Sequence, residues 1–109
     1  MRSDLSAAEV HELRQDVSKF QTRILEILAE EDRYGLAVKR ELEDYYGEKV
    51  NHGRLYPNLD GLIDYGLVEK SQLDRRTNNY ELTDAGRAFV ENDLEWQNSH
   101  ANEDNGGGE

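Results

Sequence analysis

The stretch NHGRLYPNLDGLIDYGLVEKSQLDRRTNNYELT, residues 51–83, decides the fold. Its first half carries apolar residues at helical spacing, and Gly66 ends that pattern. Asn51 can cap the start of the helix, and Pro57 should be tolerated near its first turns, with a kink around the facing carbonyl of Gly53. The apolar positions are Leu55, Leu59, Leu62 and Ile63. The sequence therefore predicts a helix between Asn51 and Gly66.

The second half of the stretch predicts a β-hairpin followed by a last helix. Leu67–Leu73 is typical of a strand, Asp74–Asn79 of a polar turn, and Tyr80–Leu82 of the returning strand. Thr83 can cap the helix that follows. Its apolar residues spread over roughly half of the circumference, which is more than one buried face needs. They are Ala85, Phe89, Val90, Leu94 and Trp96.

The N-terminal segment predicts one long helix or two shorter ones. Ser6 with Glu9 has the spacing of a capping box, and Ser18 with Gln21 has the same spacing, so the sequence leaves both possibilities open. The apolar residues of this segment follow an a/d repeat: Val10, Leu13, Val17, Phe20, Ile24 and Ile27. Such a seam packs either on its own domain or against a second subunit.

A further helix is predicted between Tyr34 and Gly47. Its apolar positions are Leu36, Val38 and Leu42. Tyr45 and Tyr46 near its end either contact a phosphate or complete the core, and we favour the core.

The order of these elements predicts the fold class. Three helices, a hairpin with a polar tip and a C-terminal helix indicate a mainly α protein, a winged helix-turn-helix with a two-stranded β wing and N- and C-terminal dimerisation helices. We expect residues 1–98 to form this domain, including the terminal helices. Residues 99–109 are expected to be a disordered acidic, Gly-rich tail.

Composition narrows the classes of function. The chain has 109 residues, no cysteine and a formal net charge of −11, so disulfides, thiolate metal sites and thiol redox switches are excluded. No run of residues is long and apolar enough for a membrane span, and we expect a cytoplasmic protein. The acidity lies at the two ends, because residues 33–80 carry eight basic and eight acidic side chains. An acid excess with few lysines is typical of proteins from a high-salt cytoplasm; the alternative is an ordinary acidic protein with a charged tail.

The residues suited to DNA contact lie where a winged helix would present them. Asn51, His52 and Arg54 begin the helix whose first residues reach base edges, and Gly53 allows close backbone approach. The hairpin tip combines adjacent arginines with amides and a hydroxyl, namely Arg75, Arg76, Thr77, Asn78 and Asn79. An isolated turn of this composition would be a solvated loop, but at a wing tip we favour a DNA contact.

Four segments together resemble a known family. The runs YGLAV at residues 34–38, GRLYPNL at 53–59, GLV at 66–68 and YELT at 80–83 are similar in order and spacing to the PadR-like winged-helix transcriptional regulators, over about residues 18–90. The acidity makes the chain most similar to the small haloarchaeal members. The resemblance implies a homodimer on a pseudo-palindromic operator and a role in the oxidative-stress response. The third helix would enter the major groove, and the wing would lie at the minor groove.

These observations predict a sequence-specific transcriptional regulator and not an enzyme. No nucleophile motif, metal spacing or cofactor motif is present, so we expect no catalytic residue, no metal and no cofactor. The candidate DNA-binding residues are Asn51, His52, Gly53, Arg54, Tyr56, Arg75, Arg76, Thr77, Asn78 and Asn79. The candidate dimer contacts are Val10, Leu13, Val17, Phe89, Val90, Leu94 and Trp96. The expected partners are double-stranded DNA and a second copy of the chain, with no membrane; K⁺ or Na⁺ at the acidic surfaces is a further candidate. The alternative is a winged-helix protein–protein interaction module without DNA specificity of its own.

Overall fold

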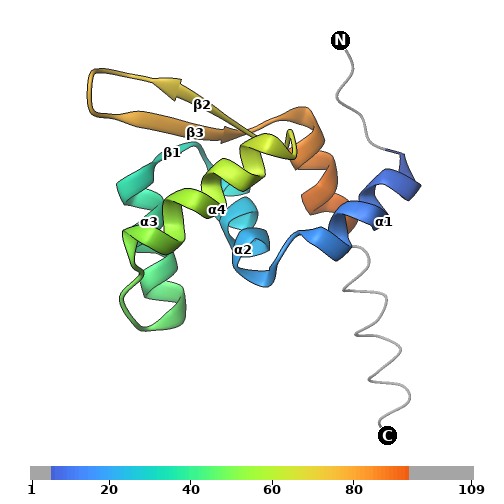
Figure 1. The fold of residues 1–109 in the computed structure, drawn as a ribbon, viewed down its shortest axis with the longest axis horizontal. Helices are drawn as coiled ribbons and strands as arrows, with labels where there is room; N and C mark the ends of the chain where they lie inside the picture. The colour runs from blue at the N-terminus through green and yellow to red at the C-terminus, as the bar shows by residue number, and fades with distance from the viewer. Residues whose placement is uncertain (1–5, 94–109) are drawn as a thin grey trace, which may run out of the picture.

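The computed structural model describes residues 6–93, in which short helices and a small sheet surround one core (Figure 1). The elements are α1 (Ala7–Asp16), α2 (Lys19–Glu30), β1 (Arg33–Tyr34), α3 (Gly35–Tyr46), α4 (His52–Asp64), β2 (Val68–Gln72) and β3 (Asn78–Leu82). Residues 84–93 are also helical. The winged helix-turn-helix predicted from the sequence is confirmed: α3 and α4 form the helix-turn-helix, and β2 and β3 form the wing.

The N-terminal segment is two helices. Ser6 caps α1 and Ser18 caps α2, each with the complete capping box that the sequence predicted. Between them Val17 has φ −80° and ψ 123°, an extended conformation that ends α1. Because the second box satisfies the first N–H groups of α2 locally, the chain can change direction here at little cost.

The two strands of the wing belong to a three-stranded sheet, whose third strand the sequence did not predict. The strand order is β1-β3-β2, and both pairings are antiparallel. The third strand, β1, places Arg33 opposite Tyr80 and Tyr34 opposite Asn79. A strand of two residues has no periodicity that could reveal it in the sequence. Its consequence is that the start of α3 is fixed directly beside the wing.

The two helices of the helix-turn-helix end and begin where the sequence predicted. Gly47 ends α3 with φ 73°, a left-handed conformation that favours glycine. Asn51 caps α4, accepting a hydrogen bond at its Oδ1 from the Gly53 N–H at 2.6 Å. Pro57 lies inside α4, which continues past it. The buried amide of Gln21 donates to the Asn58 carbonyl and so connects α2 to α4.

The helix over residues 84–93 is joined to the rest of the fold at Thr83. The Thr83 hydroxyl accepts from the Gly86 N–H at 2.9 Å, which confirms the predicted cap, and donates to the Gly66 carbonyl at 2.7 Å. Gly86 itself lies against the Leu67 carbonyl so closely that a Cβ would collide with it. The start of this helix is therefore fixed against the start of β2.

The core takes side chains from every helix and from the sheet. Its largest fully buried members are Phe89, Ile24, Leu25, Leu28, Leu42, Leu55, Leu59, Leu62, Leu67, Val38 and Val68. Each such side chain contributes about 1.5–3 kcal/mol of burial free energy. None of the described helices is long and apolar enough to cross a membrane.

The residues proposed as dimer contacts lie mostly inside this core. Val10, Val17 and Phe89 are buried within one chain, and Leu13 and Val90 pack against the same cluster. Leu94, Trp96 and the predicted boundary at residue 98 lie outside the described residues. An ion pair between Arg14 and Asp93, at 3.3 Å, further joins α1 to the last helix. A subunit contact through these helices would have to use their exposed side chains.

Candidate nucleic-acid interface

The start of α4 presents four exposed residues in succession, Asn51 to Arg54. The Oδ1 of Asn51 is occupied by the helix cap, so only its amide nitrogen is available as a donor. The ring of His52 stacks on that of Tyr56, one turn further on, with centroids 5.6 Å apart and planes 10° from parallel. The first turn of α4 therefore presents an ordered set of donors and one aromatic pair.

Tyr56 is positioned by a glycine in a different helix. A Cβ at Gly35 would lie 2.7 Å from the Tyr56 hydroxyl oxygen and 2.9 Å from its Cε1. The start of α3 can approach the Tyr56 ring this closely only because residue 35 has no side chain. This contact explains why the chain carries glycine directly before the α3 apolar pattern.

The wing tip is ordered by an aspartate. Asp74 Oδ1 accepts hydrogen bonds from the backbone N–H groups of Arg76 and Thr77, both at 2.9 Å. These bonds hold the pKa of Asp74 below its ordinary value, because they favour the ionised carboxylate. Arg75 and Arg76 are both exposed on this turn. Although the tip lies outside the strands, the hydrogen bonds to Asp74 hold the backbone from which the Arg76 side chain extends.

A cleft of about 450 Å³ brings the wing and the helix-turn-helix together. Its lining residues come from the start of α3, from α4 and from the wing: Tyr34, Gly35, Leu36, Tyr56, Leu73, Asp74, Arg76, Thr77, Asn78 and Tyr80. Figure 1 shows the wing tip and the starts of α3 and α4 at one end of the molecule, with α1 at the other. Four of the predicted DNA-binding residues, Tyr56, Arg76, Thr77 and Asn78, thus line one concave surface.

Several residues of this cleft were not predicted from the sequence. Leu36, expected in the core of its helix, is 48 % exposed, and Leu73 is 55 % exposed at the end of the wing. Tyr34 is the N-cap residue of α3, but its side chain accepts no hydrogen bond from the first N–H groups of this helix. Burial, together with the neighbouring Tyr56, raises the pKa of Tyr80 and keeps its hydroxyl protonated. For the α3 side of this surface, the sequence signal was the Tyr-Gly pair before the helix.

The remaining predicted residues lie around the cleft rather than in it. Arg54 places its guanidinium over the ring of Phe20, and Arg75 is exposed at the tip. Asn79 belongs to the central strand and is paired on both sides, with Tyr34 and with Ser71. The wing therefore presents Arg75 and Arg76 outward, whereas Asn79 acts mainly within the sheet.

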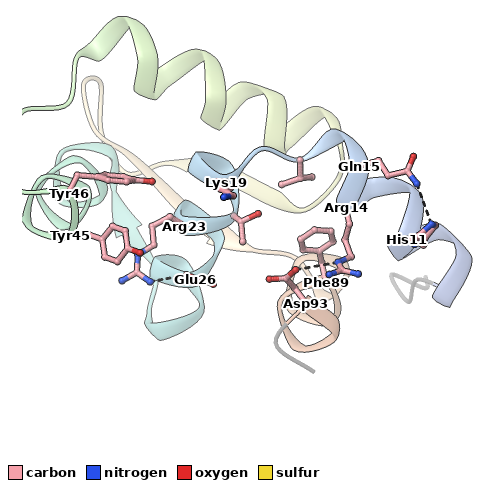
Figure 2. A pocket seen from close by; sticks show the side chains of 12 residues that line it. His11, Arg14, Gln15, Lys19, Arg23, Glu26, Tyr45, Tyr46, Phe89 and Asp93 are labelled. Carbon is pink, nitrogen blue, oxygen red and sulfur yellow. Dashed lines mark hydrogen bonds and ion pairs between the residues drawn. The ribbon is translucent and has the colours of Figure 1, made fainter. Parts of the chain in front are cut away.

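The prediction that Tyr45 and Tyr46 complete the core is wrong. Tyr45 is 56 % exposed and Tyr46 is 39 % exposed. They line a second cavity, of about 790 Å³, formed with α1, α2 and the last helix. Figure 2 shows the Arg23 guanidinium against the Tyr45 ring, 3.8 Å from its centroid, and paired with Glu26. The end of α3 exposes these rings because nothing in the described chain covers that end.

The basic side chains of the middle region divide into paired and available ones. Arg33 is surrounded by three glutamates and Lys39 is paired with Glu43 at 3.0 Å, so neither is free for DNA. The others form no ion pair within the described chain, and they are Arg40, Lys49, Arg54, Lys70, Arg75 and Arg76. These six are the basic side chains of the middle region that remain available to a phosphate backbone, and of them Arg76 lines the cleft.

A helix-turn-helix followed by a wing, with available cations on both, defines a winged-helix DNA-binding protein. The model of the transcriptional regulator PadR-like family matches residues 24–92. The RosR-S1 complex structure is similar at 64 % identity and a TM-score of 0.77, covering 79 % of this chain and 77 % of that one. RosR of H. salinarum, in a structure grown from NaBr, is similar at 65 % identity and a TM-score of 0.77, covering 78 % and 77 %. The chain belongs to the PadR-like family and is a DNA-binding transcriptional regulator.

More distant structures share the fold. A PadR-like transcription factor from B. fragilis is 23 % identical, with a TM-score of 0.69 over 84 % of this chain and 91 % of that one. A search of curated proteins gave no match.

Proposed function

We propose that the chain acts as a homodimer on a pseudo-palindromic operator, with the start of α4 in the major groove and the wing at the minor groove. The cleft between α3, α4 and the wing carries this proposal, because its lining suits the phosphate backbone that separates the two grooves. Arg76 supplies a positive charge beside the carboxylate of Asp74. Tyr34, Tyr56 and Asn78 supply hydrogen-bond donors, and the first residue of α3, Gly35, brings a helix N-terminus to the cleft.

Base recognition in this proposal belongs to α4. His52 and Arg54 reach base edges from the first helical turn, where the Asn51 cap holds the backbone. Tyr56 and the wing residues Arg75 and Arg76 contact the backbone or the minor groove. Thr77, Asn78 and Asn79 support the wing side of the contact.

Dimerisation is proposed at the end of the molecule opposite the wing. The exposed residues of α1 and of the last helix surround the cavity of about 790 Å³, and a second copy could cover this surface. Sedimentation in molar KCl should give twice the 12.6 kDa mass of one chain. A monomer at micromolar concentration, under conditions in which the operator is bound, contradicts the homodimer.

The cellular role follows from similarity to RosR and from composition. We propose a cytoplasmic regulator in a high-salt cell, in the oxidative-stress response, with K⁺ or Na⁺ near its acidic surfaces. Because the chain has no cysteine, any oxidant would have to be sensed without a thiol on this chain. Deleting the gene should change the transcription of its targets after peroxide treatment; an unchanged response refutes this role.

The test of the binding mode compares two arginines with a third. Arg54→Ala should relax the preference at particular operator positions, by about 1–3 kcal/mol if it contacts a guanine edge. Arg76→Ala should weaken binding to all duplexes by similar factors. Arg87→Ala is the matched control, since Arg87 is an exposed cation on the last helix.

Selection of binding sites from a random duplex library measures all three variants. The opposite pattern for Arg54 and Arg76 would show that the roles of helix and wing are exchanged. If the wild-type chain selects no duplex in molar KCl, the protein-interaction alternative replaces the operator proposal.

A further inference from the structure

Arg54, the candidate base reader on α4, is held by an aromatic ring and not by a carboxylate. Its Cζ lies 3.9 Å from the centroid of the Phe20 ring. In the described part of the chain its guanidinium makes no ion pair or hydrogen bond. Phe20 belongs to α2 and is only 5 % exposed. A side chain in an exposed turn therefore rests on a ring of the core.

The position of the Phe20 ring is itself fixed from two directions. Its backbone is in the first turn of α2, which the Ser18–Gln21 capping box orders. Its ring stacks on that of Tyr46, with centroids 6.1 Å apart and planes 19° from parallel. Tyr46 in turn meets Tyr45 edge to face, with centroids 4.9 Å apart. Phe20 thus gives Arg54 a rigid surface, supported by the end of α3.

Stacking suits a guanidinium that must also recognise a base. The N–H donors of arginine lie in the plane of the group, so a ring against the face leaves them free at the edge. A bidentate contact to guanine O6 and N7 uses those donors. An arginine already restrained in this way loses less rotamer freedom on binding than a free one.

We propose that Phe20 is a positioning residue for base recognition, and that its ring orients the Arg54 guanidinium toward one base of the operator. The inference rests on the proposed function of Arg54 as a base reader. It assigns a specificity role to a core residue of α2 that touches no DNA. Loss of the ring should then change which sequence is preferred, and not only how tightly DNA is bound.

The test is Phe20→Leu, with Leu28→Ala as the control. Leu28 is a buried residue of the same helix, 1 % exposed, and it lines neither of the two cavities described above. Both variants create a cavity in the core, but only Phe20→Leu removes the ring against Arg54. Discrimination against the wrong base pair at the position that Arg54→Ala identifies should fall by about twofold to fivefold in Phe20→Leu, the range of an exposed cation–π contact. Leu28→Ala should keep the wild-type discrimination.

Each outcome of the selection experiment decides the proposal. If Arg54→Ala loses discrimination and Phe20→Leu does not, Phe20 is a core residue only and the inference is wrong, while the proposed function stands. If Phe20→Leu and Leu28→Ala weaken binding to all duplexes alike, the effect is one of stability and the inference is also wrong. If Arg54→Ala itself keeps the wild-type preference, the proposed role of Arg54 fails, and the inference fails with it.

A measurement on the wild-type chain covers the case in which Phe20→Leu does not fold. A guanidinium over an aromatic face experiences a ring current, so the Arg54 δ and ε protons should resonate upfield of those of other arginines such as Arg87. NMR spectra of the wild type and of Arg54→Ala assign these signals. Ordinary shifts for Arg54 would show that the stack does not form in solution, which overturns the inference.

Discussion

Gly35→Ala should weaken DNA binding strongly while changing the free energy of unfolding little. The new Cβ would lie 2.7 Å from the Tyr56 hydroxyl oxygen, 2.9 Å from Cε1 and 3.2 Å from Cζ. Ordinary van der Waals contact begins near 3.4 Å, so the Tyr56 ring must move by several tenths of an ångström. Tyr56 lines the cleft of about 450 Å³, which gives its ring room to move. The ring can therefore move without breaking the core.

The free energy of unfolding should change little, because two effects oppose each other. Tilting the ring away from its rotamer costs about 0.5–1.5 kcal/mol. Replacing glycine by alanine in a helix contributes about 0.4–1 kcal/mol by restricting the unfolded chain. The net change should lie within about 1 kcal/mol, which shifts the Tm by at most about 8 °C.

Operator affinity should fall much more than stability. A hydrogen bond to a charged group contributes about 1.5–3 kcal/mol, so a displaced Tyr56 hydroxyl should weaken binding about tenfold to a hundredfold. Gly61→Ala is the control for a tight glycine contact away from the cleft, since its Cβ would lie 3.0 Å from the buried, hydrogen-bonded amide nitrogen of Gln21. In a Tyr56→Phe background the same Gly35 change should cost less, because the nearest atom is gone. A folded Gly35→Ala protein with wild-type affinity would refute the role given to Tyr56.

Three further predictions concern charged side chains and the salt dependence of binding. Repulsion from Asp32 and Glu69 raises the pKa of Glu81. Glu81→Gln should therefore raise the Tm at low salt and lose that advantage in molar KCl. For the same reason, the wild type should gain stability at low salt as the pH falls through the raised pKa. Asp74→Ala should abolish hydrogen-exchange protection of the Arg76 and Thr77 amides, and Asp74→Asn should keep part of it. Since the pKa of Asp74 is lowered, this ordering is present above its ordinary pKa and lost as the pH falls through the lowered value. Operator affinity should show a log–log slope against KCl much shallower than the roughly −0.9 per phosphate contact of ordinary DNA binders; a steep slope contradicts it.

Elements with local signals were predictable from the sequence. Both capping boxes, the Asn51 cap and the Thr83 cap depend on residues three or fewer apart, and the structure confirms all four. The hairpin was also predictable, although β3 begins at Asn78, two residues earlier than predicted. Backbone pairing with β2 and β1 extends the strand into residues that would otherwise favour a turn.

Features that depend on distant contacts were not predictable. The strand β1 exists because β3 lies beside it, and the cleft exists because β1 fixes the start of α3 near the wing. An apolar pattern likewise cannot tell a core position from an exposed one at the end of a helix, as Leu36 shows. The stack of Arg54 on Phe20 joins two helices, and neither residue alone indicates it.

The proposed binding mode requires a chain of net charge −11 to bind DNA in concentrated salt, and the chemistry of the cleft suits this requirement. At 1 M salt the Debye length is about 3 Å, so carboxylates at the ends of the chain no longer repel the duplex, but releasing counterions no longer contributes either. Binding must then come from directed hydrogen bonds and from contact area. The cleft offers both: three tyrosines, an asparagine, a threonine and two exposed leucines accompany one arginine and one aspartate, Asp74, in its lining. At low salt the same interface keeps these contacts, but the Debye length of about 10 Å at 0.1 M lets the acidic ends act on the phosphates again. In the proposed binding mode, the acid excess therefore sets the salt range in which this interface works, and the side chains of the cleft and of α4 set the sequence that it binds.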